Sequence, residues 1–308
     1  MAWTTSDTVM KFREQYRVVD VVVETLDGWR RHQSSKDAWL LAFFTFLSIF
    51  PLLLAAVTIL GFVLDGNPDL RERIVNGAMG EIPVLGDELV NSPDAISGGF
   101  WSVVLGVGGA LWSSGKAFVG LQTGLDDTWD VPLDNRANLA VQRGKALLGV
   151  AIIGASQIGS IAIATIISAA ELPAFGDIAL TIGTVGINIL VIAAMYRFLT
   201  SHETTWGDVW PGAAIAGVVF TLLQRFGTSL VIRFAGVDNE AKKNITNAAA
   251  DSGGDTRQTI GLIIGIITWL SLVGITVMMC AELNAALKRL RTTTHAERSP
   301  DMAIAIRN

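Results

Sequence analysis

The chain contains six apolar stretches that are each long enough to cross a lipid bilayer. A helix rises about 1.5 Å per residue and the hydrocarbon core is about 30 Å thick, so roughly 20 apolar residues span it. Residues 38–64 contain no Asp, Glu, Lys or Arg, and the other stretches hold few charges. The six stretches are residues 38–64, 98–125, 146–170, 178–196, 209–234 and 260–281. The sequence therefore predicts an all-α, polytopic membrane protein with six transmembrane helices.

Composition argues against several classes of function. Hydrophobic residues make up 51% of the chain and charged residues 17%, whereas about 25% of the residues in a soluble domain are charged. The net charge of −5 is opposite to the basic surface that nucleic-acid binding needs. One cysteine, Cys280, and three scattered histidines supply no ligand spacing for a metal. We therefore expect no catalytic residues, no cofactor, no metal and no nucleic-acid partner.

The distribution of Lys and Arg predicts the orientation of the chain. Fifteen of these residues lie in the amino-terminal segment, beside or between alternate spans and in the tail, against five in the other loops. Positive residues in short loops stay on the cytoplasmic side. Because an even number of spans places both ends on one face, we expect both termini to be cytoplasmic.

Two regions outside the spans are expected to be helical. Between residues 9 and 31, apolar residues recur in steps of three and four, which is typical of one stripe on an amphipathic helix. These residues are Phe12, Tyr16, Val19, Val23 and Leu26. Such a helix lies either on the membrane surface or against the inner ends of the spans, and the sequence leaves both open. In the longest outer loop, residues 65–97, we expect short helices.

No low-complexity segment divides the chain. We therefore predict a single transmembrane domain over residues 1–308. Residues 1–37 form its cytoplasmic amphipathic segment, residues 38–288 its six-span bundle and residues 289–308 a cytoplasmic tail. We expect the tail to be disordered after Arg291.

Polar residues within or at the ends of the apolar stretches are the candidate functional residues. An ionisable group in the hydrocarbon core is costly, so it marks a functional site by default and needs a partner. Lys116 and Glu282 fall at depths that differ by roughly 5 Å at 1.5 Å per residue, so we expect them to pair if their helices are adjacent. The alternative is that the polar groups only hydrogen-bond one another and hold the bundle together. The predicted substrate pathway comprises Lys116, Arg225, Glu282, Asn284, Gln224, Gln157 and Asn188.

Helix-breaking residues predict where the spans bend. Ser113, Ser114 and Gly115 directly precede a charged residue, so we expect the second span to be irregular there. Pro51 removes a backbone donor and is expected to kink the first span, with Ser48 helping to satisfy the freed carbonyls. The predicted helix hinges are therefore Pro51, Ser113, Ser114 and Gly115.

Four motifs resemble signatures of the YihY/virulence-factor BrkB family and occur in the same order. They are AFFTFLSIFPLLL at residues 42–54, LDDTW at 125–129, WGDVWPGA at 206–213 and AELNA at 281–285. The resemblance implies a six-span protein of the bacterial cytoplasmic (inner) membrane that contributes to cell-envelope integrity and moves lipids or other amphiphiles. The family also carries an older ribonuclease BN label. The sequence does not support that label, because it has no histidine-rich metal motif and no basic surface.

We therefore predict a membrane transporter or flippase-like exporter of a lipid or other amphiphile, because cations inside an apolar bundle suit an anionic head group. Two alternatives stay open: a channel or small-solute transporter, and a non-transporting structural membrane protein. A lateral opening between helices favours the first function and a continuous wet pore favours the channel. Fully paired polar residues without a cavity favour the structural protein. The expected partners are membrane lipids and the amphiphilic substrate, and homo-oligomers remain an option.

Overall fold

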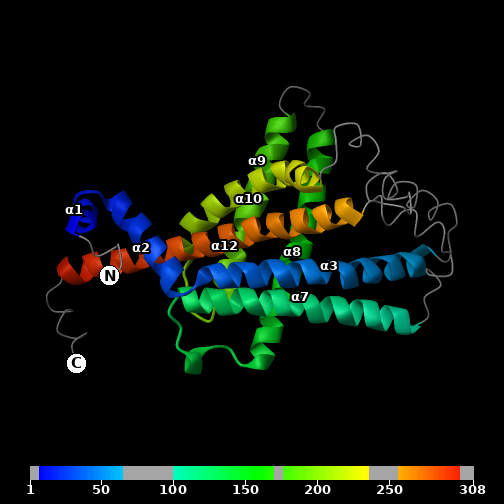
Figure 1. The fold of residues 1–308 in the computed structure, drawn as a ribbon, viewed down its shortest axis with the longest axis horizontal. Coiled ribbons are helices and arrows are strands. Elements are labelled where there is room, and N and C mark those ends of the chain that lie inside the picture. Colours follow the sequence, from blue (N-terminus) through cyan, green and yellow to red (C-terminus); the bar gives the residue numbers. More distant parts are fainter. Residues whose placement is uncertain (1–6, 65–99, 170–175, 236–255, 299–308) are drawn as a thin grey trace. The chain divides into compact units, whose positions relative to one another are not determined.

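All regular elements are helices in the part of the chain that the structure describes (Figure 1). In this computed structural model the described residues are 7–64, 100–169, 176–235 and 256–298. The elements are α1 (Asp7–Gln15), α2 (Arg17–Arg31), α3 (Ser34–Leu64), α7 (Phe100–Thr128), the 3₁₀ helix η2 (Leu133–Asn135), α8 (Leu139–Ala169), α9 (Gly176–Leu199), α10 (Trp206–Ala235) and α12 (Thr256–Arg298). The prediction of an all-α protein is confirmed for these residues.

Long helices coincide with the apolar stretches of the sequence. Among the described residues, four segments are long and apolar enough to cross a membrane: Leu139–Ser156, Ile178–Leu199, Trp206–Gly227 and Ile263–Thr293. They belong to α8, α9, α10 and α12. The apolar stretches of α3 and α7 include side chains outside the described set. The structure therefore supports a polytopic membrane protein, and the number of six spans stays a prediction.

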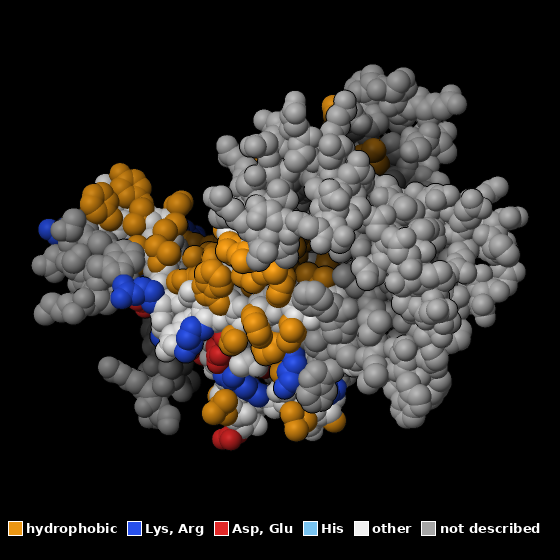
Figure 2. Space-filling view, turned by 45° about the vertical axis from the view of Figure 1, so that its right-hand side comes forward, with side chains coloured by type: hydrophobic (Ala, Val, Ile, Leu, Met, Phe, Trp, Pro, Cys, Tyr) orange, Lys and Arg blue, Asp and Glu red, His pale blue; other side chains and the backbone are white. Residues whose placement is uncertain are grey.

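The long helices expose apolar side chains. Figure 2 shows hydrophobic side chains gathered over the described part of one face. Large examples are Ile182, which is 67% exposed on α9, and Phe226, which is 64% exposed on α10. Contiguous apolar surface of this kind is rare on soluble monomers. It suits helices whose outer faces contact lipid.

Two compact units share these helices. The first comprises Met1–Leu41, Phe118–Gln224 and Leu272–Asn308, and the second comprises Ala42–Ala117 and Arg225–Ser271. The core of the first unit is formed by residues such as Leu125, Ala193, Tyr196, Leu199, Val209 and Met278. In the second unit, Gly227 of α10 faces the indole of Trp269 on α12. The predicted single domain stays a prediction.

Glycines allow close helix contacts inside the first unit. A Cβ on Gly217 of α10 would lie 2.7 Å from the backbone N of Ile189 on α9. A Cβ on Gly274 of α12 would lie 2.6 Å from the carbonyl oxygen of Ala38 on α3. Without these methyl groups the backbones can approach closely, as is common in membrane helix packing.

The amino-terminal segment forms two helices, so the prediction of one helix over residues 9–31 is wrong. The segment breaks at Tyr16, and Arg13 of α1 reaches back to Asp20 of α2 at 2.7 Å. The predicted apolar stripe divides accordingly. Phe12 and Tyr16 are exposed, whereas Val23 is buried. Only the α2 part of the apolar stripe therefore packs against the neighbouring helices.

The predicted break in the second span is also wrong. α7 is a continuous helix through Ser113, Ser114 and Gly115. Ser and Gly lower helix propensity by only about 1 kcal/mol or less per residue. An open turn in the hydrocarbon region would leave backbone groups unpaired, which costs several kcal/mol each. The helix therefore persists, and a hinge role for these residues stays a prediction.

Two other sequence expectations are affected by the helix boundaries. α3 is helical across Pro51, and Ser48 Oγ donates to the Thr45 carbonyl at 2.7 Å rather than to the carbonyls that Pro51 frees. At the carboxyl end, α12 runs to Arg298, so disorder does not begin after Arg291. The short helices expected in the first outer loop fall in residues 65–97, outside the described residues.

Candidate functional site

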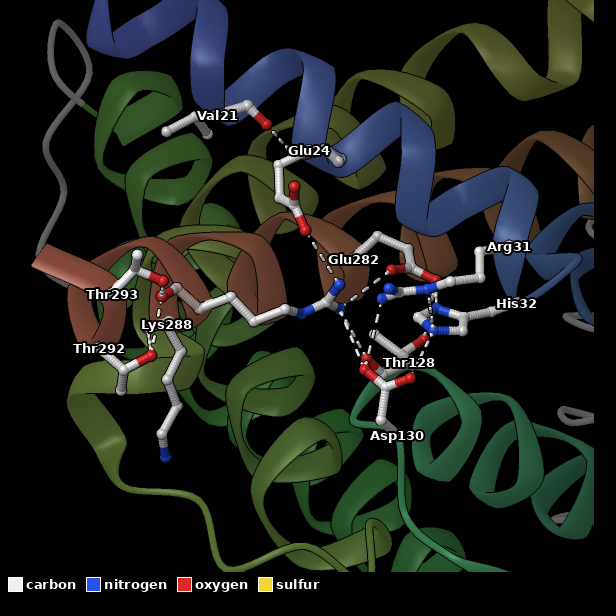
Figure 3. Close-up of polar contacts among 12 residues, drawn as sticks. Val21, Glu24, Arg31, His32, Thr128, Asp130, Glu282, Lys288, Thr292 and Thr293 are labelled. Atoms are coloured by element: carbon white, nitrogen blue, oxygen red, sulfur yellow. Dashed lines mark hydrogen bonds and ion pairs between the residues drawn. The ribbon is translucent and has the colours of Figure 1, made fainter. Parts of the chain in front are cut away.

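Glu282 of α12 is a fully buried carboxylate and the centre of a polar cluster (Figure 3). Its Oε1 atom accepts from Ser34 Oγ at 2.6 Å, and lies 2.8 Å from His32 Nδ1 and 3.4 Å from Thr128 Oγ1. Ser34 begins α3, His32 lies in the turn before it, and Thr128 ends α7. One carboxylate oxygen therefore joins three chain segments to α12.

The other oxygen of Glu282 is enclosed without a hydrogen-bond partner among the described residues. The nearest cation is Arg289, whose Nη2 atom lies 3.9 Å from Oε2. α2 covers this oxygen at Gly28, where a Cβ would lie only 2.5 Å from Oε2. Only glycine at this position allows α2 to pass so close to the carboxylate.

Arg289, about two turns further along α12, links the end of α7 and α2 to α12. Its Nη2 atom donates to the Thr128 carbonyl at 3.0 Å, and its Nη1 atom lies 3.3 Å from Glu24 Oε1 on α2. A guanidinium offers five donors in a rigid fork, which suits this bridging position. The cations that compensate Glu282 are therefore Arg289 and, when protonated, His32.

His32 lies between two carboxylates. Its Nε2 atom is 3.1 Å from Asp130 Oδ1, opposite the Nδ1 contact to Glu282. Burial lowers the pKa of His32, but the hydrogen bonds and charges of Glu282 and Asp130 outweigh it and raise the pKa above 6.5. Only the imidazolium can donate from both ring nitrogens. The site therefore favours a protonated His32.

Asn284, two residues after Glu282 on α12, binds the backbone of α10. Its Oδ1 atom accepts from the Gly212 N–H at 2.7 Å, and its Nδ2 atom donates to the Val209 carbonyl at 3.1 Å. Both contacts flank Pro211, an internal proline of α10. Pro has no N–H and disturbs the helical hydrogen bonds around it. The buried amide of Asn284 therefore holds α10 against α12 beside Pro211.

A second set of contacts closes the same end of the first unit. Lys288 Nζ of α12 pairs with Asp208 Oδ2 of α10 at 2.9 Å and lies 5.6 Å from the Trp129 ring centroid. Trp129 stacks on His202 at 4.9 Å between centroids. Buried Asp126 accepts from the Ser201 N–H at 2.6 Å and thereby ties the end of α7 to the end of α9.

Three of the four family-like motifs thus meet in space. The motif at residues 125–129 contacts the motif at 281–285 through Thr128 and Glu282. The motif at 206–213 contacts the latter through Gly212 and Asn284. These motifs therefore specify how α7, α10 and α12 join at one end.

The predicted pairing of Lys116 with Glu282 is wrong. The ion-pair partners found for Glu282 are His32 and Arg289. Thr128, which contacts Glu282, follows Lys116 by twelve residues on continuous α7, a rise of about 18 Å at 1.5 Å per residue. The depths of Lys116 and Glu282 had been counted from the ends of the apolar stretches. The comparison failed because the helices extend beyond those ends.

Asn188 and Gln224 form a separate polar cluster within the candidate spans of α9 and α10. Asn188 Nδ2 donates to Thr221 Oγ1 at 2.9 Å and to Gln224 Oε1 at 3.0 Å. Thr221 is buried, whereas Gln224 and the adjacent Arg225 are exposed. We call Asn188, Thr221 and Gln224 the mid-span amide cluster. The side chain of Gln157 lies outside the described set.

Sequence reasoning missed most of the Glu282 cluster. His32, Ser34 and Arg289 were not candidates because they lie outside the apolar stretches, where polar residues are ordinary. The contact between His32 and Glu282 spans 250 residues of sequence. A usable signal was the pair of buried polar residues in the motif at 281–285, which required partners from other segments.

Comparison with known proteins gives one family and one relative. The sequence model of the family described as virulence factor BrkB matches residues 25–305. The relative is YfkH of Bacillus subtilis (strain 168), which is named a ribonuclease-like protein. Its sequence is 23% identical to this chain over 291 residues, which cover 86% of this chain and 94% of the relative. No solved structure matches the chain. In the described residues, no group of three or more His, Cys, Asp or Glu is placed to hold a metal ion.

Proposed function

The chain belongs to the virulence factor BrkB family, and from that premise we propose that it moves a lipid or another amphiphile across the bacterial cytoplasmic membrane. The proposal includes six spans with both termini in the cytoplasm and a contribution to cell-envelope integrity. Its substrate pathway comprises Arg225, Lys116, Gln157 and the mid-span amide cluster. Glu282 and Asn284, which the sequence also places in this pathway, join helices within the first unit.

The mid-span amide cluster is the observation that carries the proposal. Gln224 and Arg225 are exposed although α10 is apolar enough to span a membrane. Exposed amides and cations are costly against lipid tails even when they have a protein partner, so such groups generally face protein, water or a polar ligand. A lipid head group that enters from the side of α10 would supply that polar environment. An anionic head group would also match the charge of Arg225.

The buried network around Glu282 and Asn284 supports a structural role for these two residues. Both are enclosed and their hydrogen bonds join helices. The proposal does not include the ribonuclease activity in the relative's name, because the net charge of −5 of this chain disfavours binding of RNA, a polyanion. The exposure of Gln224 on α10 would allow a lipid to enter from the side, which favours an amphiphile carrier over a channel with an axial pore.

Reconstitution tests the transport proposal. Liposomes with and without the protein contain a trace of phosphatidylglycerol carrying a fluorescent acyl chain, and external dithionite bleaches only probe that reaches the outer leaflet. We expect the wild-type protein to make inner-leaflet probe accessible. Arg225→Gln should slow this step by at least about tenfold, since a hydrogen bond to a charged group contributes about 1.5–3 kcal/mol.

Arg291→Gln is the matched control, because Arg291 is an exposed arginine of α12 outside the proposed pathway. It should transport at the wild-type rate. A zwitterionic probe should be less sensitive to Arg225→Gln than the anionic probe. Identical bleaching in protein-free and protein-containing vesicles, or equal losses in the two arginine variants, would contradict the proposal.

A further inference from the structure

His32 and its neighbours have the geometry of a device with two hydrogen-bonding states. The ring lies in the turn between α2 and α3, and its side chain is only 7% exposed. Nδ1 faces Glu282, while Nε2 faces both an acceptor and a donor. The acceptor is Asp130 Oδ1 at 3.1 Å, and the donor is Arg31 Nε at 3.2 Å.

Each protonation state of His32 satisfies a different partner at Nε2. The imidazolium donates from Nδ1 to Glu282 and from Nε2 to Asp130. A neutral ring that keeps its Nδ1 proton still donates to Glu282, but its Nε2 atom can only accept, and Arg31 can donate to it. When the ring loses one proton, the hydrogen-bond partner of Nε2 therefore changes from Asp130 to Arg31, and the ring itself need not move.

The two partner segments are held in tight local geometry. Gln33, beside His32, has φ +56°, and Asp130 has φ +53°. Both are left-handed conformations that non-glycine residues adopt rarely and at a cost. At the end of α7 the Asp130 N–H donates to the Asp127 carbonyl at 3.0 Å and the Val131 N–H donates to the Asp126 carbonyl at 2.9 Å, which closes the turn locally. The His32–Asp130 contact adds a side-chain link between the two turns across 98 residues of sequence.

We infer that His32 is a proton-operated latch that fastens the loop after α7 to the turn between α2 and α3. In the closed state the imidazolium bridges Glu282 and Asp130. In the open state the neutral ring keeps Glu282 and pairs with Arg31. Asp130 then loses its contact with His32 and keeps only the longer ion pairs of its Oδ2 atom, with Arg31 Nη2 at 3.4 Å and Arg289 Nη2 at 4.0 Å. The inference does not depend on which molecule the protein moves, or on whether it moves one.

The charges around His32 set the direction of the switch. Glu282 and Asp130 favour the imidazolium, whereas Arg31 beside Nε2 and Arg289 beside Glu282 oppose it. Because the pKa of His32 is raised above 6.5 in the folded protein, the latch is closed below about pH 6.5. It opens as the pH rises through the folded pKa.

A second titratable group, the carboxyl of Asp37, is coupled to Glu282 and therefore needs its own control variant. Asp37, in the first turn of α3 ahead of the predicted span, has its pKa raised to about 6 by burial and by the charge of Asp127. Its charge also couples to Glu282. Ionisation of Asp37 adds negative charge as the pH rises, so it would favour the closed state and oppose the opening expected of His32.

Cysteine accessibility tests the latch, because Cys280 is the only cysteine in the chain. In a Cys280→Ala background of the full-length protein, Val131→Cys reports on a residue next to Asp130 that is 7% exposed. Leu133→Cys on the same loop is 79% exposed and corrects for the pH dependence of thiol chemistry. The measured quantity is the ratio of the two maleimide-labelling rates between about pH 5.5 and pH 8.5.

We expect this ratio to be low in acid and to rise several-fold as His32 loses its proton. His32→Gln should give a ratio without a pH transition. Asp130→Asn should move the transition to lower pH, because it removes one charge that favours the imidazolium. His202→Gln and Asp37→Asn should both retain the transition.

Three results would overturn the inference. They are a ratio that does not change with pH in the otherwise wild-type chain, the same rise in His32→Gln, and loss of the rise in His202→Gln or Asp37→Asn. If His32→Gln fails to fold, the direction of the shift in Asp130→Asn decides, because Asp130 is half exposed and tolerates an amide. A transition at unchanged pH in Asp130→Asn contradicts the latch.

Discussion

Gly212→Ala is expected to lower the free energy of unfolding by about 2–6 kcal/mol, from overpacking plus two lost buried hydrogen bonds. A Cβ at this position would overlap the carbonyl oxygen of Cys280 and lie 2.6 Å from Asn284 Nδ2. Relief of the overlap requires α10 and α12 to separate, which breaks both contacts of the Asn284 amide. Thermal melting of the solubilised protein should show a decrease in Tm of about 10 °C or more.

Gly207→Ala provides the matched control in the same helix. The nearest atom to a Cβ there is Thr205 Oγ1 at 3.9 Å, an ordinary van der Waals contact. The control should melt close to the wild type. Equal Tm values for the two alanine variants would show that the contact between α10 and α12 at Asn284 does not carry the stability that we assign to it.

Glu282→Gln is the second large effect expected. Glutamine keeps a carbonyl for the Oε1 contacts with Ser34, Thr128 and His32, but it removes the charge that compensates two cations. Loss of one partner from a buried ion pair costs about 3–5 kcal/mol. The new amide N–H₂ group would also face Arg289 in place of the unpartnered oxygen.

The loss in Glu282→Gln should depend on pH. Glu282 raises the pKa of His32, so the stability that this pair contributes is present below about pH 6.5 and declines as the pH rises through the folded pKa. The decrease in Tm should therefore be larger in acid than in base. Adding His32→Gln should cost less than the sum of the two single substitutions, since both remove the same interaction.

Glu203→Gln is the control for Glu282→Gln, because Glu203 is an exposed glutamate in the loop before α10. It should leave Tm nearly unchanged. Additive losses in the His32→Gln and Glu282→Gln double variant, or a loss that is the same at every pH, would contradict the ion pair.

The membrane class and the long helices were predictable because hydropathy is a sum over about 20 residues. Individual side chains contribute little to such a sum, so errors at single positions cancel. The stretch at residues 178–196 thus predicts α9 (Gly176–Leu199) closely. Boundaries set by polar residues were less predictable. α7 passes through Ser113 and Gly115, and α12 continues beyond Arg291.

The candidate site was predictable only in part. Glu282 and Asn284 stood out because polar groups at the end of an apolar stretch need partners, and the structure gives both residues partners. The identity of these partners depends on how helices distant in sequence pack. Depth along a span cannot supply it, since it ignores rotation about the helix axis and the true helix ends. His32 and Arg289 were therefore missed, and Lys116 was paired wrongly.

Asn188→Leu, with Tm and lipid transfer measured on the same preparation, tests most directly whether the mid-span amide cluster is a pathway or a structural contact. Hydrogen bonds between membrane helices contribute about 0.6 kcal/mol on average, so we expect little change in Tm. Transfer of anionic lipid should fall by about tenfold, as expected when a contact of about 1.4 kcal/mol is lost. Thr184→Val, which removes a hydroxyl one turn earlier on α9 that, among the described residues, bonds only within its own helix, should preserve both. A clear decrease in Tm in Asn188→Leu with unchanged transfer per folded protein would contradict the account and assign the cluster to helix packing.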